Sequence, residues 1–169
     1  MDSFGRLDIV INNAGIIRMG AYDEMPESDW QGVLRTNLYG VYNCCYVFTP
    51  NMVKAKKGRI VTIVSDSGRT GEPKLAVYAS AKAGAQGFVR SLAKELGRYN
   101  VTCNAVSLSS LMPDMPEEQL AQFMQSDQAK AQMARYTIRR YGKSTDVAAL
   151  VTFLCSDAAE WITGQTYPL

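Results

Sequence analysis

Two short runs rich in β-branched residues, residues 7–11 and 59–64, set the strongest limit on how this chain can fold. Apolar runs of this length, bounded by polar or turn-forming residues, are typical of strands buried on both faces of a parallel sheet. The first run ends in Asn12-Asn13-Ala14-Gly15 and the second in Ser65. Strand and helix patterns alternate, so the sequence predicts an α/β fold, and ligands in such folds bind at the carboxyl ends of the strands.

The rest of the chain continues this alternation without repeats, low-complexity tracts or linkers, which predicts one domain over residues 1–169. The expected elements are helices over 27–56 (interrupted at Gly40) and 77–98, a strand over 101–106, a Met- and Gln-rich helical segment over 113–136, a helix from 145 to 155, and a last strand within 162–169.

Tyr78 and Lys82 lie four residues apart, which places both on one face of the second expected helix. A nearby ammonium favours the phenolate and lowers the pKa of a tyrosine, so this pair can take a proton from an alcohol. The plainer alternative is a solvated surface pair, because both residues are common on helices. Ser65 lies thirteen residues before Tyr78, directly after a predicted strand, and this favours the catalytic interpretation.

With these residues together, the chain closely resembles the short-chain dehydrogenase/reductase family, in particular the single-domain branch that includes the 3-oxoacyl-acyl-carrier-protein reductases. The resemblance spans nearly the whole chain, and the matched residues are Asn12-Asn13-Ala14-Gly15, Asn37, Ser65, Tyr78, Lys82, Asn104 and Ile162-Thr163-Gly164-Gln165. It implies a Rossmann-like, doubly wound parallel sheet.

The resemblance also implies a role for each catalytic candidate. Tyr78 would be the general acid/base, and Ser65 would hydrogen-bond the substrate oxygen. Lys82 would lower the pKa of Tyr78, and Asn37 would anchor a water that passes the proton to solvent. Two plainer alternatives are a helix-interior amide bonded to nearby backbone for Asn37 and a turn hydroxyl for Ser67.

The cofactor implied by the resemblance is NAD or NADP, whose nicotinamide exchanges the hydride. The choice between the two is set by a segment after the family's second strand, which this sequence lacks. The residues expected at the cofactor are Asn13, Ala14, Gly15, Tyr78, Lys82 and Leu111, with Lys82 holding the nicotinamide ribose. The substrate would be a secondary alcohol or ketone, such as a 3-oxoacyl compound or another lipophilic molecule.

On the nicotinamide side the sequence departs from the family pattern. Where the family usually has Pro-Gly followed by a threonine near the carboxamide, this chain has Leu108-Ser109 and then Pro113. Backbone contacts near Leu111 and a hydroxyl from Ser109 or Ser110 are the expected substitutes. The helical segment 113–136 is expected to cover the substrate as a lid, although its methionines also suit ordinary packing.

The family's glycine-rich pyrophosphate turn is not in this sequence, so we expect an incomplete sheet without the family's first three strands and with its last strand cut short. The strand at residues 7–11 should then be an unpaired apolar edge, prone to aggregation or pairing. One alternative to an enzyme follows, an inactive fragment serving at most in oligomerisation or interaction. A second, a regulatory pseudoenzyme, is motivated by Leu108 and Pro113. An in-frame glycine-rich segment upstream would favour the enzyme.

Composition narrows the function further. The net charge is +2, and the one basic cluster, residues 54–59, lies at a helix end and lacks interleaved aromatic residues, so no nucleic-acid partner is expected. The chain has no histidine, and its four cysteines lack paired spacing, which predicts reduced thiols and no metal site. No membrane span or signal peptide is visible, so we expect a cytoplasmic protein. The family pattern further implies a homodimer or homotetramer built on the helices at 27–56 and 77–98.

Overall fold

Four parallel strands form one sheet in the computed structural model, which describes residues 5–169. They are β1 (Ile9–Asn12), β2 (Gly58–Ser65), β3 (Val101–Leu108) and β4 (Thr166–Pro168), in the spatial order β1-β2-β3-β4. Residues 58–64 of β2 and 101–107 of β3 are buried throughout, as continuous β-branched runs predict. The predicted α/β class is therefore confirmed.

The register of the strands brings their carboxyl ends to one edge of the sheet. Strand β2 runs level with β3 along its whole length, from Gly58 opposite Val101 to Ser65 opposite Leu108. Strand β1 ends earlier, with Asn12 opposite Thr62. All the polar residues that follow these strands therefore gather along the same edge.

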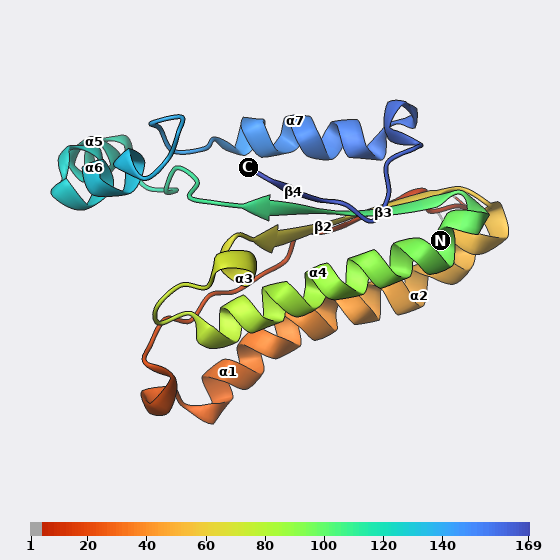
Figure 1. The fold of residues 1–169 in the computed structure, drawn as a ribbon, viewed down its shortest axis with the longest axis horizontal. Helices are drawn as coiled ribbons and strands as arrows, with labels where there is room; N and C mark the ends of the chain where they lie inside the picture. The colour runs from red at the N-terminus through yellow and green to blue at the C-terminus, as the bar shows by residue number, and fades with distance from the viewer. Residues whose placement is uncertain (1–4) are drawn as a thin grey trace.

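Helices cover both faces of the sheet (Figure 1). On one face lie α1 (Glu27–Leu34), α2 (Gly40–Ala55) and α4 (Ala76–Leu96), with α4 continuing into the short η3 (Gly97–Tyr99). On the other face lies α7 (Ser144–Cys155), followed by η4 (Asp157–Ala159). The short α3 (Ser67–Thr70) follows β2, while α5 (Glu117–Gln125) and α6 (Asp127–Ala134) lie beyond the carboxyl end of β3. A single turn, η1 (Tyr22–Glu24), precedes α1.

The helix predicted over residues 27–56 is present but changes its pitch in the middle. Between α1 and α2 lies η2 (Arg35–Tyr39), a π-helical turn of five residues that contains the buried Asn37. Such turns are rare and occur often at functional sites. The helix ends at Lys56, which adopts the left-handed conformation with φ 51°. The basic residues near it thus occupy a helix carboxyl end, as predicted.

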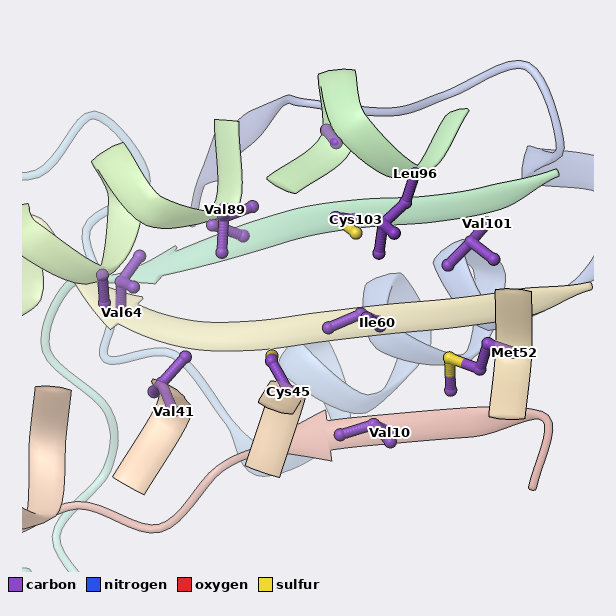
Figure 2. Close-up of a cluster of buried hydrophobic side chains, with 13 residues drawn as sticks. Val10, Val41, Cys45, Met52, Ile60, Val64, Val89, Leu96, Val101 and Cys103 are labelled. Atoms are coloured by element: carbon purple, nitrogen blue, oxygen red, sulfur yellow. The ribbon is translucent and has the colours of Figure 1, made fainter. Parts of the chain in front are cut away.

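Two apolar clusters hold the layers together. The larger one joins Val10, Ile60 and Cys103 on three strands to side chains of α2 and α4 (Figure 2), namely Val41, Cys45, Met52, Val89 and Leu96. The smaller one lies under α7 and includes Val61, Ile63, Val106 and Leu154. Apolar residues of β2 therefore point into opposite clusters, which is why both faces of the strand are buried.

Several residues of the family pattern hold β4 beside β3. The side chain of Asn104, fully buried, donates to Ile162 O at 2.8 Å and accepts from Gln165 N at 3.1 Å. The hydroxyl of Thr163 accepts a hydrogen bond of 3.0 Å from Cys103 N. These hydrogen bonds fasten the segment before β4 to β3.

In the described part of the chain, β1 forms the outer edge of the sheet, with Ile9 and Ile11 43% and 49% exposed. This agrees with the predicted unpaired apolar edge. All four cysteines are free thiols. Within residues 5–169 no group of His, Cys, Asp or Glu side chains is arranged to hold a metal ion, and no helix is long and apolar enough to cross a membrane.

Candidate active site

The first turns of α4 carry the predicted Tyr78 and Lys82 to the carboxyl edge of the sheet. Lys82 is only 5% exposed, and its Nζ donates a 2.9 Å hydrogen bond to Ile63 O in β2. The same ammonium lies 5.7 Å from the centroid of the Tyr78 ring. Lys82 is therefore buried and fixed against the sheet, and Tyr78 is half-buried beside it, which is not the arrangement of a solvated surface pair.

Asn37 lies deep beside this pair, in the π-helical turn. Its Nδ2 donates to Ile16 O at 2.7 Å and to Val33 O at 3.1 Å, and its Oδ1 accepts from Ile16 N at 3.2 Å. The predicted alternative of an amide bonded to nearby backbone is thus present in the structure. One lone pair of Oδ1 remains free after these three bonds.

Gly15 brings the segment after β1 against both of these side chains. A methyl group on Gly15 would lie 2.8 Å from Asn37 Oδ1 and 3.4 Å from Lys82 Nζ. Only a residue without a side chain permits this approach. The two neighbours predicted with it at the cofactor, Asn13 and Ala14, are exposed to solvent.

Ser65 ends β2 and receives hydrogen bonds from its own turn. Ser67 at the start of α3 donates to Ser65 Oγ from its backbone N–H at 3.3 Å and from its hydroxyl at 2.9 Å. Two donors on one hydroxyl oxygen leave the Ser65 proton free to point elsewhere. Ser67 is therefore more than the turn hydroxyl of the simpler interpretation, because it orients Ser65.

The pKa of Tyr78 differs from the expectation. Burial raises the pKa of Tyr78 above its usual value of 10.0, and the nearby Ser65 side chain opposes this only in part. Burial also lowers the pKa of Lys82. The expected lowering of the Tyr78 pKa is thus not found, because burial of the phenolate dominates and the opposing contribution comes from Ser65 and not from the lysine.

The segment after β3 carries the remaining predicted residue, Leu111. Leu111 forms an isolated parallel bridge with Gly142, and a methyl group on Gly142 would lie 2.9 Å from Leu111 Cδ2. Met112 N donates to Gly142 O at 2.8 Å, so the backbone here is held firmly. The described contacts of Leu111 are with this neighbour and not with the Tyr78 group.

Both hydroxyls expected to replace the missing threonine are engaged inside the protein. Ser109 Oγ donates to Asp66 Oδ2 at 2.9 Å. Ser110 Oγ accepts hydrogen bonds from Gln132 Nε2 at 2.5 Å and from Tyr136 Oη at 3.0 Å. Ser110 therefore fastens the helical segment at α6 to the edge of the sheet.

Sequence reasoning missed Asp66, which follows Ser65 directly and accepts hydrogen bonds from both Ser107 and Ser109. An acidic residue at the end of a buried strand is the signal that could have drawn attention to it. Its partners lie more than forty positions away, and only the strand register brings them together.

A largely apolar cavity of about 480 Å³ opens beside the segment after β3. Its walls come from that segment, from the chain between α6 and α7, from the start of α7 and from the end of β4, and they include Ser110, Leu111, Tyr136, Ile138, Val147 and Leu169. Arg140 and Asp146 also line it and form a bidentate ion pair.

Comparison with known proteins agrees with this arrangement. All of residues 1–169 match the family described as enoyl-(acyl carrier protein) reductase, which is part of the short-chain dehydrogenases/reductases. The chain belongs to the short-chain dehydrogenase/reductase family. Both the fold and the resemblance predicted from the sequence are thereby confirmed.

Relatives in the family carry one recurrent description. The 3-oxoacyl-(acyl-carrier-protein) reductase FabG of Staphylococcus aureus is 40% identical over 167 residues, which cover 98% of this chain and 65% of that protein. The corresponding reductase of Synechocystis sp. is 40% identical over 172 residues, covering 99% and 65%. FabG of Thermotoga maritima is 35% identical over 165 residues, covering 98% and 65%.

A solved structure described as a dehalogenation enzyme is also similar. It matches with a TM-score of 0.89 and 34% identity over 99% of this chain and 69% of that chain. The sequence therefore spans about two thirds of the length of its relatives, and the fold it forms is the corresponding part of theirs.

Proposed function

We propose that the chain is the catalytic part of an NAD(P)-dependent oxidoreductase that interconverts a ketone and a secondary alcohol. The observation that carries the proposal is the convergence of Gly15, Asn37, Tyr78 and Lys82 beside the carboxyl end of β2, where Ser65 lies. With Ser65 included, these groups come from the segment after β1, from η2, from β2 and from α4, and two of them, Asn37 and Lys82, are buried.

The described residues fit the ribose and nicotinamide end of a dinucleotide. Gly15 lets the backbone after β1 lie close to two polar side chains, and Lys82 has donors to spare after its one bond to Ile63 O. When bound, the reduced nicotinamide would supply the hydride to the carbonyl carbon. Ser65 would donate a hydrogen bond to the carbonyl oxygen, and Tyr78 would transfer its proton to that oxygen.

The protonation of Tyr78 favours the reductive direction. A pKa raised by burial keeps the phenol protonated, and a protonated phenol is the proton donor that carbonyl reduction needs. Oxidation of an alcohol needs the phenolate, which this environment disfavours. The names of the relatives, all reductases, point the same way.

A 3-oxoacyl thioester is the substrate we propose. The relatives are named for 3-oxoacyl compounds, whereas the family description names enoyl compounds. Ser65 and Tyr78 present two hydroxyls, and both can hydrogen-bond the single oxygen that a ketone carries on its reacting carbon. The apolar cavity beside Leu111 offers room for an acyl chain.

Titration with NADH and NADPH, followed by nicotinamide fluorescence, tests the proposal first. Turnover is then measured with an acetoacetyl thioester and, for comparison, a crotonyl thioester. We expect saturable binding, preference for the ketone, and loss of turnover by at least a hundredfold in Tyr78→Phe. Tyr22→Phe is the matched control, because Tyr22 is 70% exposed and lies outside the site.

The competing proposal is a non-catalytic module that keeps these residues but holds no dinucleotide. Absence of binding by both dinucleotides, with the chain folded, would favour it over the enzyme. Equal turnover by wild type and Tyr78→Phe would reject the mechanism even if binding occurs.

Self-association is a further part of the proposal. Tyr39, Tyr46 and Val47 are 51%, 84% and 59% exposed on η2 and α2, the helical region expected to pack across subunits. We expect a dimer or tetramer by light scattering and weaker association in Tyr46→Glu. A monodisperse monomer would contradict this expectation.

A further inference from the structure

The carboxylate of Asp66 joins the carboxyl ends of the two central strands. Its Oδ1 accepts a hydrogen bond of 2.9 Å from Ser107 Oγ, and its Oδ2 accepts one of 2.9 Å from Ser109 Oγ. The backbone N–H of Asp66 donates to Leu108 O at 3.0 Å. One residue at the end of β2 thus bonds three consecutive residues at the end of β3.

The burial of the partners shows why these bonds matter. Ser107 is completely buried, and its hydroxyl would be unpaired and costly without an acceptor. The Asp66 side chain is 25% exposed, and hydrogen bonds to an ionised acceptor are roughly twice as strong as neutral ones. Asp66 also precedes α3, yet its side chain caps no backbone N–H there. The carboxylate is directed to the strands instead of the helix.

The ion pair of Asp66 is weak by comparison. Arg69 Nη2 lies 3.5 Å from Asp66 Oδ1, and the arginine side chain is 57% exposed. Exposed pairs of this kind contribute roughly 0–1 kcal/mol. The serine bonds therefore account for the position of the carboxylate.

The bonds lie between the two halves of the proposed site. On one side is Ser65, the neighbour of Asp66 in sequence, and on the other is the segment that leads to Leu111. That segment begins with Leu108-Ser109, which lacks the fixed φ that a proline would supply. Its conformation therefore depends on bonds to the rest of the protein.

We infer that Asp66 is a positioning residue, which holds Ser107 and Ser109 and thereby fixes the segment after β3 relative to Ser65. Asp66 acts through these two hydroxyls and does not contact the reacting atoms. The inference rests on the function proposed above, since it assigns the segment a place in that reaction.

The test compares Asp66→Ala, Asp66→Asn, Ser109→Ala and the double variant Asp66→Ala/Ser109→Ala. Thr70→Val is the control, because Thr70 Oγ1 donates to the backbone oxygen of Asp66 at 3.0 Å but does not touch the carboxylate. Two properties are measured in each: kcat/KM for ketone reduction, and amide hydrogen exchange at Ser109 and Ser110, whose N–H groups are hydrogen-bonded.

We expect Asp66→Ala to lower kcat/KM by roughly tenfold or more, as displaced site residues do. Asp66→Asn should restore most of the loss, because an amide can still accept from one serine and donate to the other. The double variant should be no slower than Asp66→Ala, and Thr70→Val should match the wild type. A role in stability alone would change the melting temperature and leave kcat/KM unaltered in folded protein.

Three results would overturn the inference. The first is a kcat/KM of Asp66→Ala within twofold of the wild-type value. The second is a loss of kcat/KM in the double variant that equals the product of the losses in the two single variants. If Asp66→Ala does not fold, Ser109→Ala is judged by the same twofold criterion. If the wild type itself shows no turnover, the proposed function fails and hydrogen exchange decides. Faster exchange in Asp66→Ala but not in Thr70→Val supports the positioning role, and unchanged exchange is the third refuting result.

Discussion

Substitution of Asn37 by alanine should destabilise the fold strongly, even though the family resemblance assigns this residue to catalysis. The side chain is 1% exposed and makes three hydrogen bonds, two of them with the backbone of Ile16. Alanine leaves the N–H and C=O of Ile16 without these partners, at about 1–3 kcal/mol for each buried group. Because Ile16 is only partly buried, we take the lower half of that range and expect a loss of about 2–4 kcal/mol in the free energy of unfolding.

Urea unfolding followed by circular dichroism measures this loss directly. For a chain of this length, about 2–4 kcal/mol corresponds to a melting temperature lower by roughly 4–16 °C. Asn13→Ala is the matched control, since Asn13 is exposed, and it should stay within about 0.5 kcal/mol of wild type. A loss below about 0.5 kcal/mol in Asn37→Ala would show that the buried bonds do not hold the segment after β1, and the reasoning would fail.

Other properties can be tested in the same way. Gly15→Ala should lower the free energy of unfolding by about 1–3 kcal/mol through overpacking, because the added methyl group meets a side-chain oxygen at 2.8 Å. Gly97→Ala is the control and should be neutral, because nothing lies within 4 Å of its added methyl group. Equal stabilities of the two variants in urea would contradict this. The Arg140 hydrogen bond lowers the pKa of Asp146 from 3.8 to about 2, so its stabilising effect is present above pH 3.8 and is lost as the pH falls toward 2. The melting temperature should therefore change less between pH 5 and pH 2 in Asp146→Asn than in the wild type. Equal changes in the two proteins would refute the pairing. Burial raises the pKa of Cys45 to about 11, so this thiol should not react with an aromatic disulfide reagent until guanidinium unfolds the chain. Rapid labelling of Cys45 in the native protein, located by peptide mapping, would be inconsistent with that burial.

Much of the fold could be predicted because its determinants are local. The β-branched runs before Gly15 and Ser65 gave both strands to within two residues, and the small-residue helix from residue 77 was found to within one residue at its start. The π-helical turn at Asn37 could not be predicted, because nothing in the residue types of that stretch distinguishes it from an α-helix.

The sequence could single out the candidate residues of the site but not their electrostatics. The spacing of Ser65, Tyr78 and Lys82 identified the group, yet the pKa of Tyr78 depends on how much of the phenol is buried, which spacing cannot reveal. The contacts of Asp66 with Ser107 and Ser109 were also out of reach, because they depend on the register of two strands distant in sequence.

The π-helical turn also sets which way α2 faces. Val33 in α1 and Val41 in α2 are eight positions apart, and an uninterrupted α-helix, at about 100° per residue, would turn them roughly 80° away from each other. A π-helical turn absorbs about one extra residue, so the two valines are effectively seven positions apart, close to two full turns, and both point inward. Deleting one residue from η2 would leave the two valines seven positions apart in a regular helix, about 700° of turn, so α2 would keep its orientation. Closing the turn into a regular α-helix with all of its residues kept would instead rotate α2 by roughly 100° and turn its buried side chains away from the core. The π-helical turn therefore reconciles the packing at both ends of the helix.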